Sequence, residues 1–324
     1  MHPAFRRFLP LVDGRFALQI YLPIADLPVN MFLLLGMGLA IGYISGMFGI
    51  GGGFLLTPLL IFIGISPAVA VASVSPQIAA SVFTGFLYYW RRRSIDFALG
   101  GMLLVGGIFG TALGVWFFTF LRAMDQLDLF IGLSYVTLLS IVGAIMIYES
   151  IRAELRARRG GPATLRRPGS HNWLHGLPFK LRFKRSKIYV SAIPVWGIGL
   201  IIGFVGAVLG IGGGFLLVPM LIYFLRVPTA TVIGTSMMLT VITMASATLL
   251  HAVDNHLVDA LLALLLMIGG VIGAQFGART SQNMRGERLR LLLGLMVFAV
   301  GMRFAYDLVV TPEDLYSLRL VRGQ

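Results

Sequence analysis

The sequence of 324 residues contains no cysteine, which excludes a disulfide framework, a thiolate metal site and thiol catalysis. Charged residues are also scarce, at 12% of the chain, whereas a soluble domain carries about a quarter. Apolar residues instead make up 57%, and the mean hydropathy is +0.88. This composition predicts an all-α polytopic membrane protein.

The apolar stretches also lack the polar groups of an active site. They contain no paired carboxylates, no histidine cluster and no nucleophile beside a base, and the acids Asp96, Glu149 and Asp259 lie at the ends of the stretches. We therefore expect no enzymatic activity, no catalytic residue, no metal and no cofactor.

Ten residues of the chain occur almost twice. The segment GIGGGFLLTP, from Gly49 to Pro58, returns as GIGGGFLLVP, from Gly210 to Pro219. The similarity continues on both sides of these segments, since matching glycines, prolines, serines and aspartates recur at nearly constant spacing. We interpret the chain as two copies of one membrane repeat.

Each copy contains about four apolar stretches near the ~20 residues that a spanning helix requires, and one short stretch directly after the glycines. A short stretch of this kind predicts a half-helix or a re-entrant segment. The stretches are 29–48, 54–65, 67–90, 97–121 and 127–148 in the first copy, and 189–209, 215–225, 228–250, 258–278 and 289–310 in the second.

Basic residues are distributed so that equivalent loops fall on opposite sides of the membrane. Arginines 91–93 and the arginines of the loop at 279–290 predict cytoplasmic loops, whereas the loops at 122–128 and 251–259 are expected outside. The two copies are thus predicted to be inverted repeats with about ten membrane segments and external termini.

The predicted domains follow from this reading. They are an N-terminal segment (1–28) without the apolar core of a signal peptide, the first repeat (29–149), a basic cytoplasmic loop (150–188), the second repeat (189–310) and a C-terminal tail (311–324). Eleven of the 26 Lys and Arg residues lie between Ser150 and Val190. We expect this loop to lie near anionic lipid headgroups and not to bind nucleic acid; the sequence leaves the oligomeric state open.

The duplicated glycines are the main candidate binding site. Unwound backbone at membrane depth occurs where it is buried in protein or lines a cavity, and a helix that begins there directs N–H groups and a positive dipole end toward an anion. The alternative is that the glycines only let helices touch. The candidate substrate-binding glycines are Gly49, Gly51, Gly52, Gly53, Gly210, Gly212, Gly213 and Gly214.

Polar residues near the beginning of the helix after each break are further candidates. Ser75, Gln77, Thr235 and Ser236 either donate hydrogen bonds to an oxyanion or bond back to their own helix. Gln275 is an uncharged amide inside an apolar stretch and therefore requires a partner or a cavity.

Three other groups of residues are assigned mainly structural roles. Asp96 and Asp259 occupy matched positions where a carboxylate caps a helix, with ion coupling as the alternative. His251 and His256 flank an external loop and are expected to be solvated, with a role as proton carriers as the alternative. Stripes of glycines four residues apart are predicted to bring helices into close contact; they are Gly106, Gly110 and Gly114, and Gly269, Gly273 and Gly277.

The paired GxGGGFLxxP motifs, the Val-Ser or Thr-Ser steps after them and the paired glycine stripes resemble the TauE/SafE family of membrane transporters, also called the sulfite exporter family. The resemblance covers about residues 29–310. It implies movement of small sulfur-containing anions, such as sulfite, sulfoacetate or other organosulfonates, across a bacterial inner membrane. The copies differ at one step, where Ser73-Val74-Ser75 of the first stands against Gly234-Thr235-Ser236 of the second.

The residues and the resemblance lead to one hypothesis. A small anion binds near the middle of the membrane between the two glycine breaks, and the inverted halves expose it alternately to each side, most simply for export. Gly52→Val and Gly213→Val are then expected to abolish transport and leave membrane insertion intact. An ion-coupled uptake carrier or a channel for another small anion remains the alternative.

Overall fold

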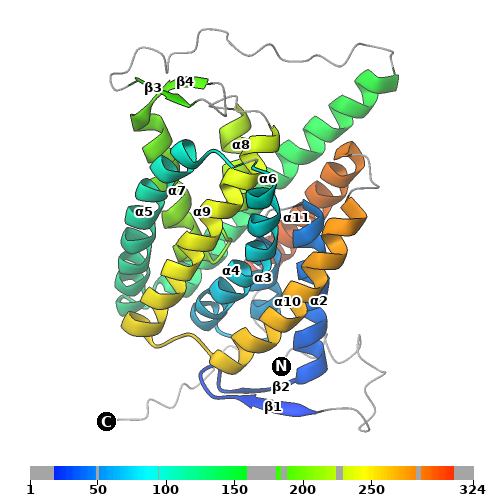
Figure 1. Ribbon diagram of the computed structural model, residues 1–324. Helices are drawn as coiled ribbons and strands as arrows, with labels where there is room; N and C mark the ends of the chain where they lie inside the picture. Colours follow the sequence, from blue (N-terminus) through cyan, green and yellow to red (C-terminus); the bar gives the residue numbers. More distant parts are fainter. Residues whose placement is uncertain are drawn as a thin grey trace.

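The computed structural model describes residues 18–48, 51–93, 95–158, 180–183, 188–223, 229–281 and 286–309, and these parts form a helical bundle with two small β-hairpins (Figure 1). Its helices are α2 (Met31–Phe48), α3 (Gly53–Phe62), α4 (Pro67–Arg91), α5 (Phe97–Ala123), α6 (Leu127–Arg158), α7 (Ala192–Leu209), α8 (Gly214–Tyr223), α9 (Thr229–Leu250), the π-helical turn η2 (His251–Asn255), α10 (Ala260–Ser281) and α11 (Gly286–Val309).

The chain is a multi-pass membrane protein by the length and apolar composition of its helices. Six of the described helices are long and apolar enough to cross a membrane, namely α4, α5, α6, α7, α9 with η2, and α10. The apolar helix α2 and the apolar part of α11 are somewhat shorter, and α3 and α8 have only ten residues each. At about 1.5 Å per residue, ten residues span roughly 15 Å, half of the hydrocarbon layer.

Helix boundaries agree with the predicted stretches to within a few residues, with one exception. Helix α6 was expected to end near Tyr148 but continues to Arg158, so the first basic residues of the central loop extend a helix. The predictions for residues 1–17, 159–179 and 310–324 lie outside the described residues.

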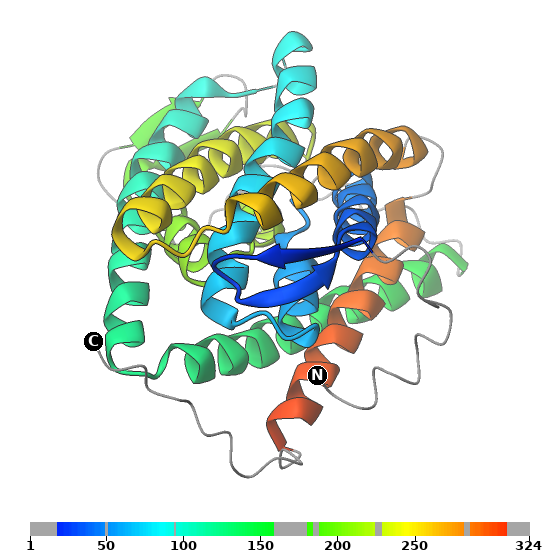
Figure 2. The same cartoon turned by 90° about the horizontal axis from the view of Figure 1, so that it is seen from below.

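Two antiparallel hairpins are absent from the all-α prediction. Strands β1 (Gln19–Leu22) and β2 (Leu27–Asn30) precede α2, and strands β3 (Lys180–Phe183) and β4 (Ile188–Ser191) precede α7. They lie at opposite ends of the bundle (Figure 1). Seen from below, the first hairpin lies across the end of the helices (Figure 2).

The helices of the two copies pair crosswise. The most extensive contacts join α2 with α10 and α5 with α7, and further contacts join α6 with α11 and α4 with α9. Thus the first helix of each copy, α2 or α7, packs against the third long helix of the other copy, α10 or α5. The helices that follow the short segments, α4 and α9, pack against each other.

The glycine stripes make these pairings close, as predicted. A Cβ at Gly110 of α5 would lie 2.0 Å from the carbonyl oxygen of Leu200 in α7. A Cβ at Gly273 of α10 would lie 2.1 Å from the carbonyl oxygen of Leu39 in α2. Any larger side chain at these positions would force the two backbones apart.

Candidate functional site

The two glycine breaks meet at the centre of the bundle. The first residues after them, Phe54 of α3 and Phe215 of α8, are buried, and their rings stack with centroids 4.6 Å apart and planes 11° from parallel. A Cβ at Gly53 would lie 2.4 Å from the carbonyl oxygen of Gly210. The beginnings of the two half-helices therefore lie beside each other although they are far apart in the sequence.

The backbone conformation of both breaks requires glycine. Gly51 has a φ of +85°, and its counterpart Gly212 has a φ of +78°. Gly210 and Gly213 also have positive φ, at +63° and +57°. Residues other than glycine rarely adopt this backbone conformation, because their Cβ approaches the adjacent carbonyl oxygen.

The helix starts themselves are tightly wound. The N–H of Gly53 donates to the carbonyl of Gly51, and the N–H of Gly214 donates to the carbonyl of Gly212 in the same way. Position Gly49, equivalent to Gly210 at the end of α7, lies outside the described residues. The two breaks thus share the conformation of Gly51 and Gly212 and the hydrogen bond at each helix start, whereas Gly52, with a φ of 0°, differs from Gly213.

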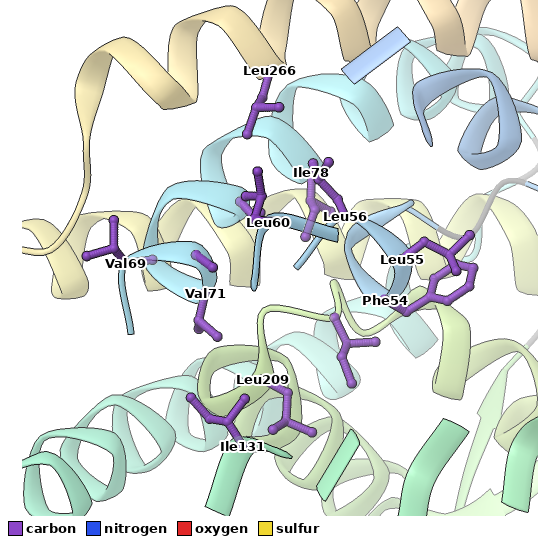
Figure 3. Packing of buried hydrophobic residues seen from close by; sticks show 14 of the residues in the cluster. Phe54, Leu55, Leu56, Leu60, Val69, Val71, Ile78, Ile131, Leu209 and Leu266 are labelled. Atoms are coloured by element: carbon purple, nitrogen blue, oxygen red, sulfur yellow. The ribbon is translucent and has the colours of Figure 1, made fainter. Parts of the chain in front are cut away.

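Apolar side chains fill the space around the first half-helix. Figure 3 shows Phe54, Leu55 and Leu56 of α3 between Leu266 on one side and Leu209 on the other. All of these residues are at most 4% exposed. Water is therefore excluded from the sides of the half-helix, which strengthens electrostatic interactions at its beginning.

Hydroxyl groups hold the last carbonyls of α7 before the second break. Tyr135 of α6 donates to the carbonyl of Leu209 at 2.5 Å, and Thr57 of α3 donates to the carbonyl of Gly210 at 3.4 Å. Carbonyls at a helix C-terminus have no partner within the helix. These bonds connect the first copy to the break of the second.

Two side chains from the central helices reach both breaks. Ile78 of α4 lies 2.3–3.1 Å from the Cβ positions of Gly51, Gly53 and Gly212. From α9, Thr240 places its Cγ2 3.7 Å from the Cβ position of Gly51 and its Oγ1 3.9 Å from that of Gly213. The hydroxyl of Thr240 is buried and has no hydrogen-bond partner among the described residues.

Sequence reasoning missed Thr240, although a signal for it exists. It aligns with Ala79 of the first copy, so only one of these two equivalent positions carries a hydroxyl. A buried hydroxyl without a partner is costly, and one beside two helix starts points to a ligand that the hydroxyl would bind.

Most of the predicted polar site residues are engaged elsewhere. Ser75 and Ser236 lie about two turns inside their helices and donate to the carbonyls of Val71 at 3.1 Å and Ile233 at 2.9 Å. Both serines therefore fit the alternative interpretation, in which the hydroxyl bonds back to its own helix. Their donors are not directed at the glycine breaks.

Gln77 and Thr235 make contacts between helices. The amide nitrogen of Gln77 donates to Ser81 at 3.0 Å, while its oxygen is buried without a partner among the described atoms. This amide packs against Gly270 of α10, whose Cβ would lie 2.4 Å from the amide nitrogen. The Thr235 hydroxyl accepts the N–H of Asp96 at 3.3 Å.

The structure places Gln275 apart from the other candidates. It lies on the exposed face of α10, so it does not line the centre of the bundle. This amide was expected to have a partner or to face a cavity. A side chain on the outer face of α10 does neither within this chain.

Asp96 and Asp259 cap helices, as predicted. Asp96 accepts the N–H groups of Ala98 and Leu99 at the start of α5. Asp259 accepts those of Leu261 and Leu262 at the start of α10, both at 3.1 Å. A hydroxyl of the neighbouring central helix holds each aspartate's own N–H, Thr235 for Asp96 and Ser73 for Asp259.

The expectation of a solvated His251 was wrong. Its side chain is fully buried, stacked edge-on against Phe118 and bonded to the carbonyl of Ala207 at 3.1 Å. His251 is the first residue of η2, a π-helical turn that continues α9, and its ring faces α5 and α7. His256, after that turn, is exposed as expected.

The centre is formed by the half-helices α3 and α8 and by the helices α4 and α9. These four helices contain one charged residue, Arg91 at the end of α4. Among the described residues, no group of three or more histidines or acids is placed to hold a metal ion. The attraction that this arrangement would offer an anion therefore comes from the helix dipoles and the Thr240 hydroxyl, because the N–H groups of Gly53 and Gly214 already have partners.

Comparison with known proteins identifies the family of the chain. The model of the sulfite exporter TauE/SafE family matches residues 34–304, which include both glycine breaks. The chain belongs to the sulfite exporter TauE/SafE family. No solved structure matches it significantly.

Relatives of this TauE/SafE protein are named as transporters. A probable membrane transporter protein of Xylella fastidiosa (strain 9a5c) is 28% identical over 282 residues, which are 84% of this chain and 94% of the relative. The probable membrane transporter protein YunE of Bacillus subtilis is 22% identical over 288 residues, 86% of this chain and 98% of the relative. Over only 60 residues, the sulfite exporter TauE/SafE family protein 1 of Arabidopsis thaliana is 42% identical. The chain is therefore a membrane transporter of this family.

Proposed function

We propose that this transporter exports small sulfur-containing anions, such as sulfite, sulfoacetate or another organosulfonate, across a bacterial inner membrane by alternating access. The observation that carries the proposal is the meeting of two half-helix beginnings around the unpaired hydroxyl of Thr240. Helix beginnings attract anions, and the hydroxyl supplies a directed donor at the same point.

Inverted repeats would provide the two access states. The crosswise pairing of α2 with α10 and α7 with α5 supports such symmetry, as do the hairpins at opposite ends of the bundle. The stacked pair of Phe54 and Phe215 would lie near the symmetry axis. A rocking motion of one half against the other would then open the centre first to one side and then to the other.

The described residues place no cationic side chain at the centre, which favours a singly charged, weakly held substrate. The cost of moving an ion into an apolar medium is large and is not offset here by a countercharge. Export of such an anion releases about 2.3 kcal/mol per charge for each 100 mV of inside-negative potential. The membrane potential alone would therefore be sufficient to drive export.

Efflux from proteoliposomes tests this function. Vesicles loaded with labelled sulfite, sulfate, thiosulfate or a sulfonate are given a defined membrane potential, and loss of each anion is followed. We expect selective loss of one monovalent sulfur anion that accelerates with an inside-negative potential. Equal loss of every anion, or of none, would contradict the proposal, and efflux that requires a cation to leave together with the anion would favour the ion-coupled uptake carrier.

Thr240→Val tests the site within the same assay. Valine keeps the shape of the side chain and removes a hydroxyl that has no partner among the described residues, so stability should not fall. Transport should fall about tenfold or more, since a hydrogen bond to a charged group is worth about 1.5–3 kcal/mol. The initial rate of efflux measures the effect.

Thr243→Val is the matched control. Thr243 lies on the same helix and is equally buried, but its hydroxyl donates to the carbonyl of Leu239 at 2.8 Å. This variant should transport at close to the wild-type rate. If both variants transport equally well, Thr240 does not contact the anion.

A further inference from the structure

We propose that His251 forms, with Asn255 and Thr119, a proton-binding site whose proton is the coupling ion of the transporter; the coupling, unlike the proton site itself, rests on the proposed function. None of these residues belongs to the glycine breaks. All three come together where η2 meets α5 and α7.

The site lies in a π-helical turn. Such turns are rare and often occur at functional positions. The turn ends at His256, a residue other than glycine with a φ of +51°. It places His251 and Asn255 inside the protein, 0% and 6% exposed.

Hydrogen-bond partners define the proton position on the ring. Nε2 of His251 faces the carbonyl of Ala207, which only accepts, so this nitrogen carries a proton. Nδ1 lies 3.3 Å from Nδ2 of Asn255, a donor, so Nδ1 is the unprotonated acceptor. The Oδ1 atom of Asn255 lies 3.0 Å from the hydroxyl of Thr119.

The same partners can satisfy a protonated ring. If Nδ1 gains a proton, a rotation of the Asn255 amide presents Oδ1 to it and turns Nδ2 toward the Thr119 hydroxyl. That hydroxyl then donates to the carbonyl of Val115, which already lies 2.9 Å away. Every donor keeps an acceptor, so the proton binds without leaving a buried polar group unpaired.

The position of this site connects it to the anion site. Ala207 belongs to the last turn of α7, whose carbonyls at Leu209 and Gly210 are held by Tyr135 and Thr57. A cation at the end of a helix is favoured by the helix dipole. A proton on His251 would therefore place positive charge beside the helix that leads into the second glycine break.

Other charges around the site are few. Helices α7 and α9 contain no charged residue, and Arg122 of α5 donates to the carbonyl of Asn255 at 3.1 Å. Asp254 is an exposed acid of η2, and Asp125 and Asp128 follow in the adjacent connection after α5 and at the start of α6. Arg122 thus connects the end of α5 to the residue whose side chain faces Nδ1 of His251.

Nuclear magnetic resonance of isotope-labelled histidine in lipid nanodiscs tests the proton site without any transport. We expect one buried imidazole to change its protonation state within the pH range in which the protein stays folded, and its signal to be missing in His251→Gln. Asn255→Asp should raise the midpoint of that titration by about one pH unit or more, because a carboxylate then faces the ring. An unprotonated His251 throughout this range, or a midpoint unmoved in Asn255→Asp, would overturn the proposal.

Transport tests the coupling. In proteoliposomes, flux of the sulfur anion should respond to a pH gradient in the wild type and in the exposed control His256→Gln, but not in His251→Gln. An unchanged response in His251→Gln would refute the coupling role. If the wild type moves none of the anions, the proposed function fails, while the titration still decides whether His251 binds a proton.

Discussion

Gly110→Ala should destabilise the protein, whereas Gly101→Ala on the same helix should leave it unchanged or slightly more stable. The Cβ added at Gly110 would lie 2.0 Å from a backbone oxygen of α7, so α5 and α7 must separate. Overpacking of this kind costs about 1–3 kcal/mol. A Cβ at Gly101 meets nothing within 4 Å, and replacing a helical glycine with alanine contributes up to about 1 kcal/mol.

Thermal unfolding in detergent micelles, followed by loss of the monodisperse species, measures the difference. Gly273→Ala in the second stripe should behave like Gly110→Ala, because its Cβ would lie 2.1 Å from a backbone oxygen of α2. Equal melting temperatures for Gly110→Ala and Gly101→Ala would mean that the two helices are not in the contact described.

The second large effect is expected from Asp259→Ala. The buried carboxylate accepts four N–H groups, two at the start of α10 and two from the turn of the first hairpin, those of Ile24 at 3.0 Å and Ala25 at 3.4 Å. Its removal deprives the helix of its cap and the hairpin of its anchor. We expect a loss of about 3 kcal/mol and release of the hairpin.

Hydrogen exchange at residues 18–30 follows the hairpin directly. Exchange there should accelerate strongly in Asp259→Ala and stay unchanged in Asp254→Asn, which alters an exposed acid of the neighbouring turn. If the hairpin stays protected in Asp259→Ala, its position depends on other contacts, such as the buried side chain of Leu22.

Local sequence features were sufficient for the helices and for the position of the breaks. The apolar runs end at glycine, proline or charged residues, so the ends of α4 and α5 could be predicted closely. The hairpins could not, because strands of four residues that contain a proline, such as β2, have no clear alternation.

The polar part of the site required the structure. Ser75 and Gln77 were candidates because they lie near the beginning of the helix after the first break, but only packing decides whether a hydroxyl meets its own helix or an open centre. The burial of His251 likewise depends on its contacts with Phe118 and Ala207, which the sequence alone does not reveal. Both outcomes follow from contacts between distant segments.

The structure also changes the expectation for the valine substitutions at the breaks. Gly213 has a positive φ, and a Cβ at Gly52 would lie 2.6 Å from Ile41. Valine is strained at the first position and overpacked at the second. Loss of transport in these variants would therefore reflect distorted packing as well as a lost site, and Thr240 gives the cleaner test.

The most direct test of an alternating-access site between the glycine breaks is the accessibility of a single cysteine at position 240. The sequence contains no cysteine, so no other thiol can react with the reagent. Thr240→Cys is treated with a negatively charged, membrane-impermeant thiol reagent in right-side-out and in inside-out vesicles. We expect labelling from both sides and slower labelling in the presence of the transported sulfur anion. Labelling from neither side, or labelling that no transported anion slows, would contradict an alternating-access site between the glycine breaks.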